Sequence, residues 1–237
     1  MVNILGVRIN KITMREAVLR TNSFFDGKPH TVFTPNPEII LECEKDEKLR
    51  EIINSSDLNL PDGIGVVIAS KILGRPVTER VAGFDFVCEL LKTDKSFYFF
   101  GSKPGVAEKA MENMNKQGAN VVGCHDGYFD DDCEIVEDIK SKKPDVLVVC
   151  LGAPKQEKWI YEHLFELNVP LCIGAGGSLD VLAGEVERAP EICQKLCIEW
   201  LYRALKEPKK RLPRIAKLPV FVADVILHGK KYKQDNF

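Results

Sequence analysis

The sequence predicts an α/β protein with a Rossmann-like parallel sheet flanked by helices, followed by a basic helical C-terminal appendage. Strand-like and helix-like segments alternate with short connections, most clearly over residues 96–177, as in parallel sheets covered on both faces. Positive charge is concentrated at the end of the chain, where residues 195–237 hold 11 Lys and Arg against four acidic residues. The first 194 residues carry a net charge of −9. We therefore predict an α/β body over 1–194 and an appendage over 195–237.

The elements of the first half follow from local patterns. Pro37 stands in the first turn of one expected helix, where its missing N–H costs nothing, and Gly74 stops another. We expect helices over 14–27, 37–56, 64–74 and 82–93, and strands over 30–36 and 57–63.

The second half has the stronger signals. Its strands are continuous apolar runs, typical of a sheet buried on both faces. One helix, over 130–143, begins with acids and ends with lysines, as the helix dipole favours. We expect strands over 96–102, 120–129, 145–152 and 169–177, with intervening helices over 106–118, 130–143 and 153–168.

Composition limits the class of protein. Apolar residues make up 45% and charged residues 29% of the 237, which excludes a disordered or collagen-like chain. The net charge of −2 gives no indication of nucleic-acid binding. The eight cysteines contain no CxxC pair, and Cys150 and Cys172 lie in strand-like runs, so we expect reduced thiols and a cytoplasmic protein. We expect no secretory signal and no segment with the roughly 20 apolar residues that span a bilayer.

Glycine-rich loops follow three of the expected strands, at the carboxyl edge where parallel sheets bind ligands. Such loops let backbone N–H groups approach a nucleotide diphosphate; ordinary turns are the alternative. Neither GxxxxGK[ST] nor GxGxxG occurs. Asp180 follows the last loop. It is a candidate to accept a hydrogen bond from a ribose hydroxyl, or else it only places a favourable negative charge at a helix N-terminus. The candidate substrate-binding residues are Gly101, Ser102, Gly152, Gln156, Gly176, Gly177 and Asp180.

Polar side chains also follow the two strands of the first half. Thr34 and Asn36 end the first strand, and Asp62 ends the second. A carboxylate facing a cleft is suited to accept a proton from a hydroxyl, although Pro-Asp-Gly is equally a turn sequence. Arg80 is a candidate for balancing diphosphate charge, or else a surface arginine.

Three consecutive acids at 130–132 contain DxD, a metal-binding pattern in many sugar-nucleotide enzymes. They also stand at a predicted helix start, where acids stabilise the helix, and we favour that interpretation. His125 is interpreted as structural, and we predict no metal site.

The appendage interleaves Trp200, Leu201 and other apolar residues with basic ones, and 215–227 is strongly apolar. This pattern is typical of an interfacial helix on an anionic membrane surface. The alternative is docking on the body or on a partner in a homo-oligomer.

Seven short motifs occur in one order along the chain. They are TPNPE at 34–38, PDG at 61–63, RVAG at 80–83, FGS at 100–102, GAPKQE at 152–157, GAGGS at 174–178 and RAP at 188–190. Through them the chain closely resembles the WecG/TagA/CpsF glycosyltransferases over nearly its whole length.

The resemblance implies inverting, metal-independent transfer of N-acetylmannosamine from a UDP-sugar donor to an undecaprenyl-diphosphate-linked N-acetylglucosamine, forming a β-1,4 bond in wall teichoic acid linkage-unit synthesis. The enzyme would be cytoplasmic and peripheral on the inner face of the cell membrane. No cofactor is implied. A UDP-sugar donor that carries N-acetylmannosaminuronic acid or glucose is an alternative within the same family. An NAD-dependent oxidoreductase and a non-catalytic scaffold are the alternative functions from other classes.

The resemblance also implies roles for residues. Asp62 would be the base, Thr34 and Asn36 would line the sugar pocket, and Arg80 would steady the diphosphate or the acceptor. Gln156 would be a pocket residue and Asp180 would contact the ribose. Arg203, Arg211 and Arg214 would fold over the site and stabilise the leaving UDP.

Overall fold

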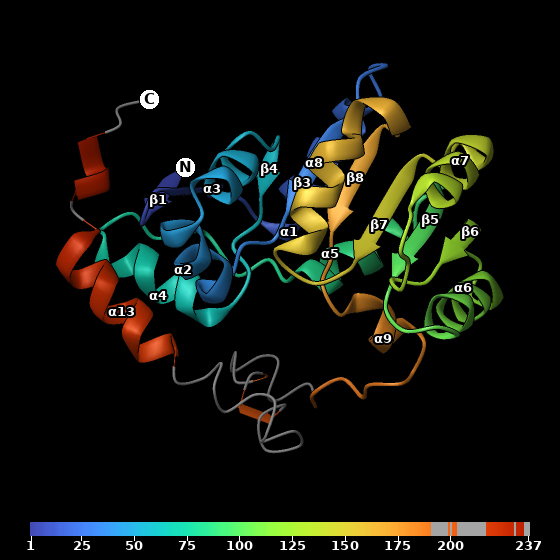
Figure 1. The fold of residues 1–237 in the computed structure, drawn as a ribbon. Helices are drawn as coiled ribbons and strands as arrows, with labels where there is room; N and C mark the ends of the chain where they lie inside the picture. The colour runs from blue at the N-terminus through green and yellow to red at the C-terminus, as the bar shows by residue number, and fades with distance from the viewer. Residues whose placement is uncertain (191–198, 200, 203–216, 230, 235–237) are drawn as a thin grey trace.

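The computed structural model describes residues 1–190, 199, 201–202, 217–229 and 231–234 (Figure 1). Its strands are β1 (Val2–Ile4), β2 (Val7–Ile9), β3 (His30–Phe33), β4 (Leu58–Asn59), β5 (Ser96–Gly101), β6 (Asn120–His125), β7 (Val146–Cys150) and β8 (Leu171–Gly174). Its helices are α1 (Met14–Thr21), η1 (Asn22–Phe24), α2 (Pro37–Lys45), α3 (Glu47–Asn54), α4 (Ile64–Ile72), α5 (Gly83–Leu90), α6 (Val106–Lys116), α7 (Cys133–Lys142), α8 (Lys155–Leu167), α9 (Ser178–Leu182), α13 (Lys217–His228) and η2 (Lys231–Gln234).

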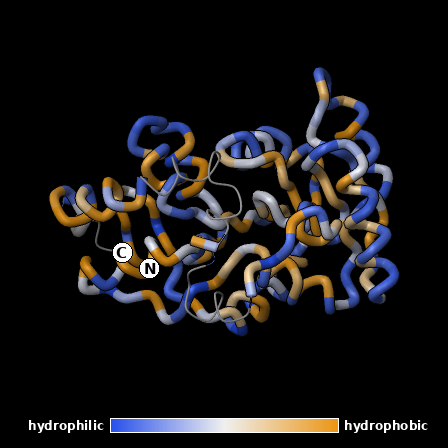
Figure 2. The backbone as a smooth tube through the Cα atoms, turned by 90° about the horizontal axis from the view of Figure 1, so that it is seen from below, coloured by the Kyte–Doolittle hydropathy of each residue, from blue (hydrophilic) through white to orange (hydrophobic). Residues whose placement is uncertain are grey.

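Six parallel strands form one sheet in the order β4-β3-β8-β7-β5-β6, which confirms the predicted fold class. Side chains alternate between its two faces, as the pleat requires. Phe97 and Phe99 face the core beneath α1, α5, α6 and α9, whereas Tyr98 and Phe100 face the core beneath α2, α3, α7 and α8. In Figure 2 the hydrophobic segments run through the interior and the hydrophilic ones lie mostly outside.

One predicted helix is wrong. The expected helix over 37–56 is two helices, because Asp46 has an extended backbone and its carboxylate accepts the Leu49 N–H at 3.0 Å. This side-chain cap begins α3 and turns the chain. The other helices keep their predicted places with ends shifted by a few residues.

The first ten residues form an antiparallel hairpin that sequence reasoning missed. Val2 pairs with Ile9 and Ile4 with Val7. The turn residues Leu5 and Gly6 have φ of 50° and 89°, as a type I′ hairpin turn requires. The hairpin continues into the edge of the sheet, where Asn10 N–H donates to the Asn59 carbonyl at 2.9 Å.

The helix α13 packs on α2 and α4, far from the right-hand strands in Figure 1. Phe221 and Val225 are 0% and 1% exposed and belong to the same core as α2 and α4. Val220, Ile226 and Leu227 on this helix are exposed. The boundary at residue 194 stays a prediction, but this part of the appendage is built into the body's core.

Candidate active site

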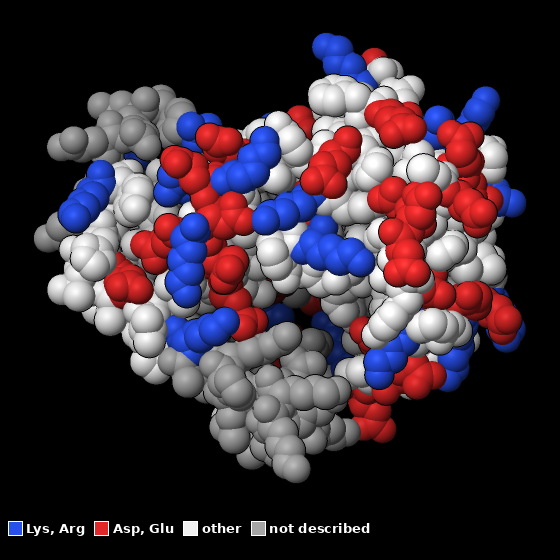
Figure 3. All heavy atoms as spheres, in the orientation of Figure 1, with Lys and Arg blue, Asp and Glu red and all other residues white. Residues whose placement is uncertain are grey.

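The strand order creates a crevice at the carboxyl edge of the sheet. The chain leaves β5 toward β6 on one side and leaves the neighbouring β7 toward β8 on the other, the arrangement at which open parallel sheets bind ligands. Strands β7 and β8 point toward the lower edge of the view in Figure 1. Figure 3 shows a hollow at this edge, with basic and acidic side chains at its rim.

Asp62 and Thr34, which follow β4 and β3, meet at the first residue of α5. The Gly83 N–H donates to Asp62 Oδ2 at 3.4 Å. A Cβ atom at Gly83 would stand 2.8 Å from Thr34 Cγ2, so only glycine permits this close approach. The Thr34 hydroxyl donates to the Gly174 carbonyl at 3.3 Å and thereby links this group to the end of β8.

The Asp62 carboxyl group has an altered acidity. Burial raises its pKa, and the Arg80 guanidinium and the Gly83 N–H oppose that rise. The neighbouring carboxylate of Glu199 raises the pKa further. A carboxyl group whose pKa is raised is a stronger base once it is ionised, which suits Asp62 to proton acceptance.

Arg80 forms an ion pair with Glu199, and their side chains are only 16% and 12% exposed. Glu199 comes from the predicted appendage, 119 residues away in sequence. Sequence reasoning missed it, since nothing in the local pattern marks one acid within a basic segment. Asn36 lies at the start of α2, where its Oδ1 accepts the Ile39 N–H at 3.1 Å as a helix cap.

The turn after β8 is held by Gln156. Its Oε1 accepts the Gly176 N–H at 3.0 Å, and its Nε2 donates to Glu157 Oε1 at 2.8 Å. Gly176 has a φ of +56°, which favours glycine. A Cβ atom at Gly177 would lie 3.5 Å from Asp180 Oδ2, so Asp180 stands beside the same turn.

The remaining candidates lie after β5 and β7. Ser102 N–H donates to the Cys150 carbonyl at 3.1 Å, and a Cβ atom at Gly101 would overlap the backbone of Cys150. Ser102 has a φ of +64°, an uncommon conformation for serine. Its buried Oγ meets no hydrogen-bond partner in the described part of the chain. The Gly152 carbonyl accepts the Gln156 N–H at 3.0 Å. The predicted residues of the body thus gather on adjoining strand ends.

Comparison with known proteins decides the family. The family model described as "Glycosyl transferase WecG/TagA/CpsF family" matches residues 2–235. The chain belongs to this family. It is 36% identical over 237 residues to a Bacillus spizizenii protein, covering 97% of this chain and 91% of the relative. It is 35% identical over 242 residues to proteins of Staphylococcus aureus strains MW2 and NCTC 8325, covering 98% and 95%. All three relatives are named N-acetylglucosaminyldiphosphoundecaprenol N-acetyl-beta-D-mannosaminyltransferase.

Membership of a glycosyltransferase family makes this chain a transferase rather than the NAD-dependent oxidoreductase considered above. The site roles of individual residues stay predictions. Arg203, Arg211 and Arg214, expected over the site, lie outside the described residues. Within the described ranges, none of the helices has the length and apolar character needed to cross a bilayer.

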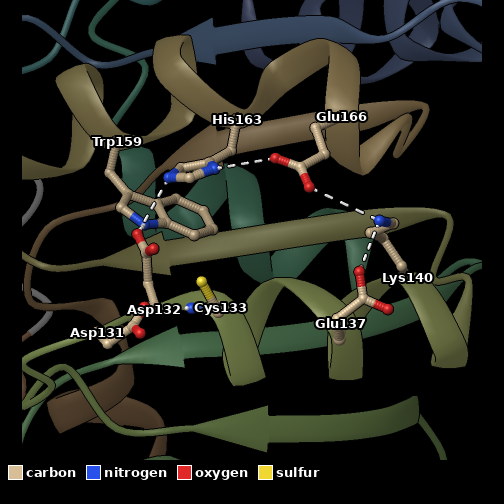
Figure 4. Close-up of polar contacts among 8 residues, drawn as sticks. All are labelled: Asp131, Asp132, Cys133, Glu137, Lys140, Trp159, His163 and Glu166. Carbon is tan, nitrogen blue, oxygen red and sulfur yellow. Dashed lines mark hydrogen bonds and ion pairs between the residues drawn. The ribbon is translucent and has the colours of Figure 1, made fainter.

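The acids at 130–132 stand before α7, and Asp132 connects the start of that helix to α8 (Figure 4). Asp131 Oδ1 accepts the Cys133 N–H at 3.0 Å at the start of α7. Asp132 Oδ2 accepts the Trp159 indole N–H at 2.6 Å and lies 3.0 Å from His163 Nε2. The described residues hold no cluster of three or more His, Cys, Asp or Glu suited to a metal. Asp131 bonds the backbone at the helix start, as the preferred interpretation expects, whereas the Asp132 carboxylate makes no cap bond and instead accepts from Trp159 on α8.

The thiols are consistent with the expectation from sequence. The six cysteines that the structure describes are free, and Cys150 and Cys172 are buried. Burial raises the pKa of both thiols to about 12, so they are poor nucleophiles. Cys193 and Cys197 lie outside the described residues.

Proposed function

We propose that this protein transfers N-acetylmannosamine from UDP-N-acetylmannosamine to undecaprenyl-diphosphate-N-acetylglucosamine, with inversion and without a metal. The observation that carries the proposal is the placement of Asp62. It stands at the carboxyl edge of a parallel sheet, bonded to the Gly83 N–H and beside Arg80. The relatives' names supply the donor sugar and the acceptor.

In the proposed reaction Asp62 accepts the proton of the acceptor's 4-hydroxyl group. The oxygen forms a bond to the anomeric carbon of the donor from the face opposite the diphosphate. The bond between that carbon and the diphosphate oxygen breaks, and its electron pair leaves with UDP. A single displacement of this kind inverts the configuration and gives the β-1,4 product.

Charge on the leaving UDP needs stabilisation, which cationic side chains supply in the absence of a metal. Arg80 is the described candidate, and Arg203, Arg211 and Arg214 are the candidates from the appendage. A guanidinium group forms charge-assisted and often bidentate bonds with phosphate oxygens. In the free protein the Glu199 carboxylate engages Arg80, so we propose that the diphosphate takes over this partner.

We further propose that the enzyme works on the cytoplasmic face of the membrane as a peripheral protein. The lipid-linked acceptor requires contact with the membrane. Exposed Val220, Ile226 and Leu227 on α13 and the basic composition of 195–237 are suited to an anionic lipid surface. Self-association through the same apolar side chains is the alternative use of this face.

The test is UDP release with a lipid-diphosphate-N-acetylglucosamine acceptor, measured with and without EDTA. We expect the enzyme to release UDP from UDP-N-acetylmannosamine. We expect no release from the UDP-linked forms of N-acetylmannosaminuronic acid, glucose and N-acetylglucosamine. Release that needs a divalent metal would refute the metal-free mechanism, and preference for another donor would reassign the sugar. No acceptor-dependent release with any of these donors would refute the transferase proposal.

Asp62→Asn tests the base, with Asp130→Asn as its matched control, because Asp130 is an exposed DxD acid. We expect Asp62→Asn to lower kcat by about 10²- to 10⁴-fold while UDP binding is retained, and Asp130→Asn to keep both. Activity of the unmodified enzyme should rise as pH rises through the pKa of Asp62, because the base must be ionised. Full turnover by folded Asp62→Asn would show that another group is the base.

A further inference from the structure

Glu157 is a buried acid that the reaction above does not use. It lies in the first turn of α8 and is 1% exposed. Its Oε2 is buried and meets no hydrogen-bond donor within the described ranges, and no described basic side chain forms an ion pair with it. A buried carboxyl group without a cation is costly to fold around, so its presence in the core calls for a reason.

Its other oxygen has one partner. Glu157 Oε1 accepts the Gln156 Nε2 hydrogen at 2.8 Å, and Gln156 is itself only 2% exposed. The opposite end of the same amide accepts the Gly176 N–H at 3.0 Å. A carboxyl oxygen accepts here and a backbone N–H only donates, so the amide of Gln156 satisfies both partners in one orientation alone.

The fixed amide supports the turn after β8. A Cβ atom at Gly174 would lie 3.0 Å from Gln156 Nε2 and 3.1 Å from Phe33 Cδ1, which places the amide against the backbone of the turn. The same turn contains Gly176 in a left-handed conformation and leads to Asp180. Glu157, Gln156 and Gly176 therefore form a continuous hydrogen-bonded connection from the core to the predicted donor site.

We propose that Glu157 is a positioning residue for the nucleoside diphosphate of the donor: it fixes the amide of Gln156, which holds the turn at 174–177 in its binding conformation. This inference rests on the proposed function, because that proposal places the donor at this turn. No direct contact between Glu157 and the substrate is involved.

The geometry gives Glu157 a role as hydrogen-bond acceptor, because its Oε1 accepts from Gln156. Burial raises the pKa of Glu157, and the bond from Gln156 opposes the rise. A neutral acid is close in shape and polarity to glutamine, so a glutamine at this position keeps an oxygen that accepts from Gln156. A methionine has similar length, suits the apolar surroundings and offers only a weak sulfur acceptor.

The test compares Glu157→Met, Glu157→Gln and Gln156→Ala in the full chain. UDP affinity is measured by calorimetry, KM and kcat by turnover, and folding by thermal melting. We expect Glu157→Met to weaken UDP binding at least tenfold and to raise the donor KM with kcat nearly unchanged. Glu157→Gln should stay within about threefold of the unmodified protein.

Tyr98→Phe is the matched control, because Tyr98 is buried in the core on the same side of the sheet as α8 and the change removes its partly buried hydrogen bond of 2.6 Å to Asp138. It should lower the melting temperature and leave UDP binding unchanged. Folded Glu157→Met that binds UDP normally would overturn the inference, as would Glu157→Gln that binds as weakly as Gln156→Ala. The comparison of Glu157→Gln with Gln156→Ala tests the inference even if Glu157→Met does not fold. If Gln156→Ala itself binds UDP normally, the proposed donor site is wrong.

Discussion

Docking of α13 on the body is open to a single-residue test through Phe221. This side chain is fully buried where α13 packs on α4 and α2. Replacing a buried phenylalanine by alanine costs about 3–5 kcal/mol. Each 1.4 kcal/mol changes an equilibrium about tenfold, so Phe221→Ala should shift the docking of α13 more than a hundredfold toward the undocked state.

The cost should appear as local opening, because α13 is one helix at the edge of the core. Hydrogen exchange of residues 217–228 should accelerate, while exchange in β5 and β7 stays slow. Turnover with a membrane-bound acceptor should fall, since α4 follows Asp62 and Gly63 directly and loses its cover. UDP binding should persist.

Val220→Ala is the matched control, because Val220 is the preceding residue of the same helix and 54% exposed. It should leave the hydrogen exchange of residues 217–228 unchanged. Unchanged exchange of α13 in Phe221→Ala would refute the docking argument. If hydrogen exchange of α13 is fast in Phe221→Ala but turnover is normal, catalysis does not depend on the docking of α13.

Three further outcomes follow from the described contacts. Burial lowers the pKa of His30, but the hydrogen bonds that its ring donates to Asp57 and Asp26 outweigh this effect and raise the pKa. The stabilisation from His30 is therefore complete below about pH 6.5 and is lost as pH rises through the higher folded pKa. His30→Gln should remove this dependence from urea unfolding. Trp159→Phe should cost about 1.5–3 kcal/mol, because its indole N–H bonds to a carboxylate at the start of α7, whereas Tyr161→Phe on the same helix should be neutral; equal costs would contradict the argument. Glu199→Gln should tighten UDP binding by about twofold to fivefold. The reason is that the ion pair between Glu199 and Arg80, worth on the order of 1 kcal/mol, no longer competes with the diphosphate for Arg80. Weaker UDP binding would show that Glu199 supports the site instead.

The sheet was predictable because its strands are continuous apolar runs, and the order of glycine-rich loops placed the candidate residues at strand ends. The break between α2 and α3 at Asp46 was not predictable, because the helical pattern continues on both sides of the side-chain cap that separates the two helices. The hairpin at the start had a signal in the alternation of Val2, Ile4, Val7 and Ile9, but its strands are only three residues long.

Within the site, sequence located single residues better than their partners. Asp62 and Gln156 were recognisable from motifs, whereas the pairing of Arg80 with Glu199 depends on a tertiary contact across 119 residues. The burial of Glu157 was equally hidden, since an acid in the first turn of a helix normally faces solvent and the helix dipole favours it there. These contacts depend on how elements distant in sequence pack, which local patterns do not specify.

The N-terminal hairpin has a consequence for how the molecule behaves among its copies. An edge strand offers unpaired N–H and C=O groups to any neighbouring chain, and natural proteins cover such edges. Asn10 uses its backbone N–H and its side-chain oxygen on Asn59, at 2.9 and 2.8 Å, so the outer side of β4 is occupied from within the same chain. Residues 1–10 thus protect the β4 edge of the sheet from pairing with a strand of another molecule. The edge strand at the opposite side of the sheet is β6.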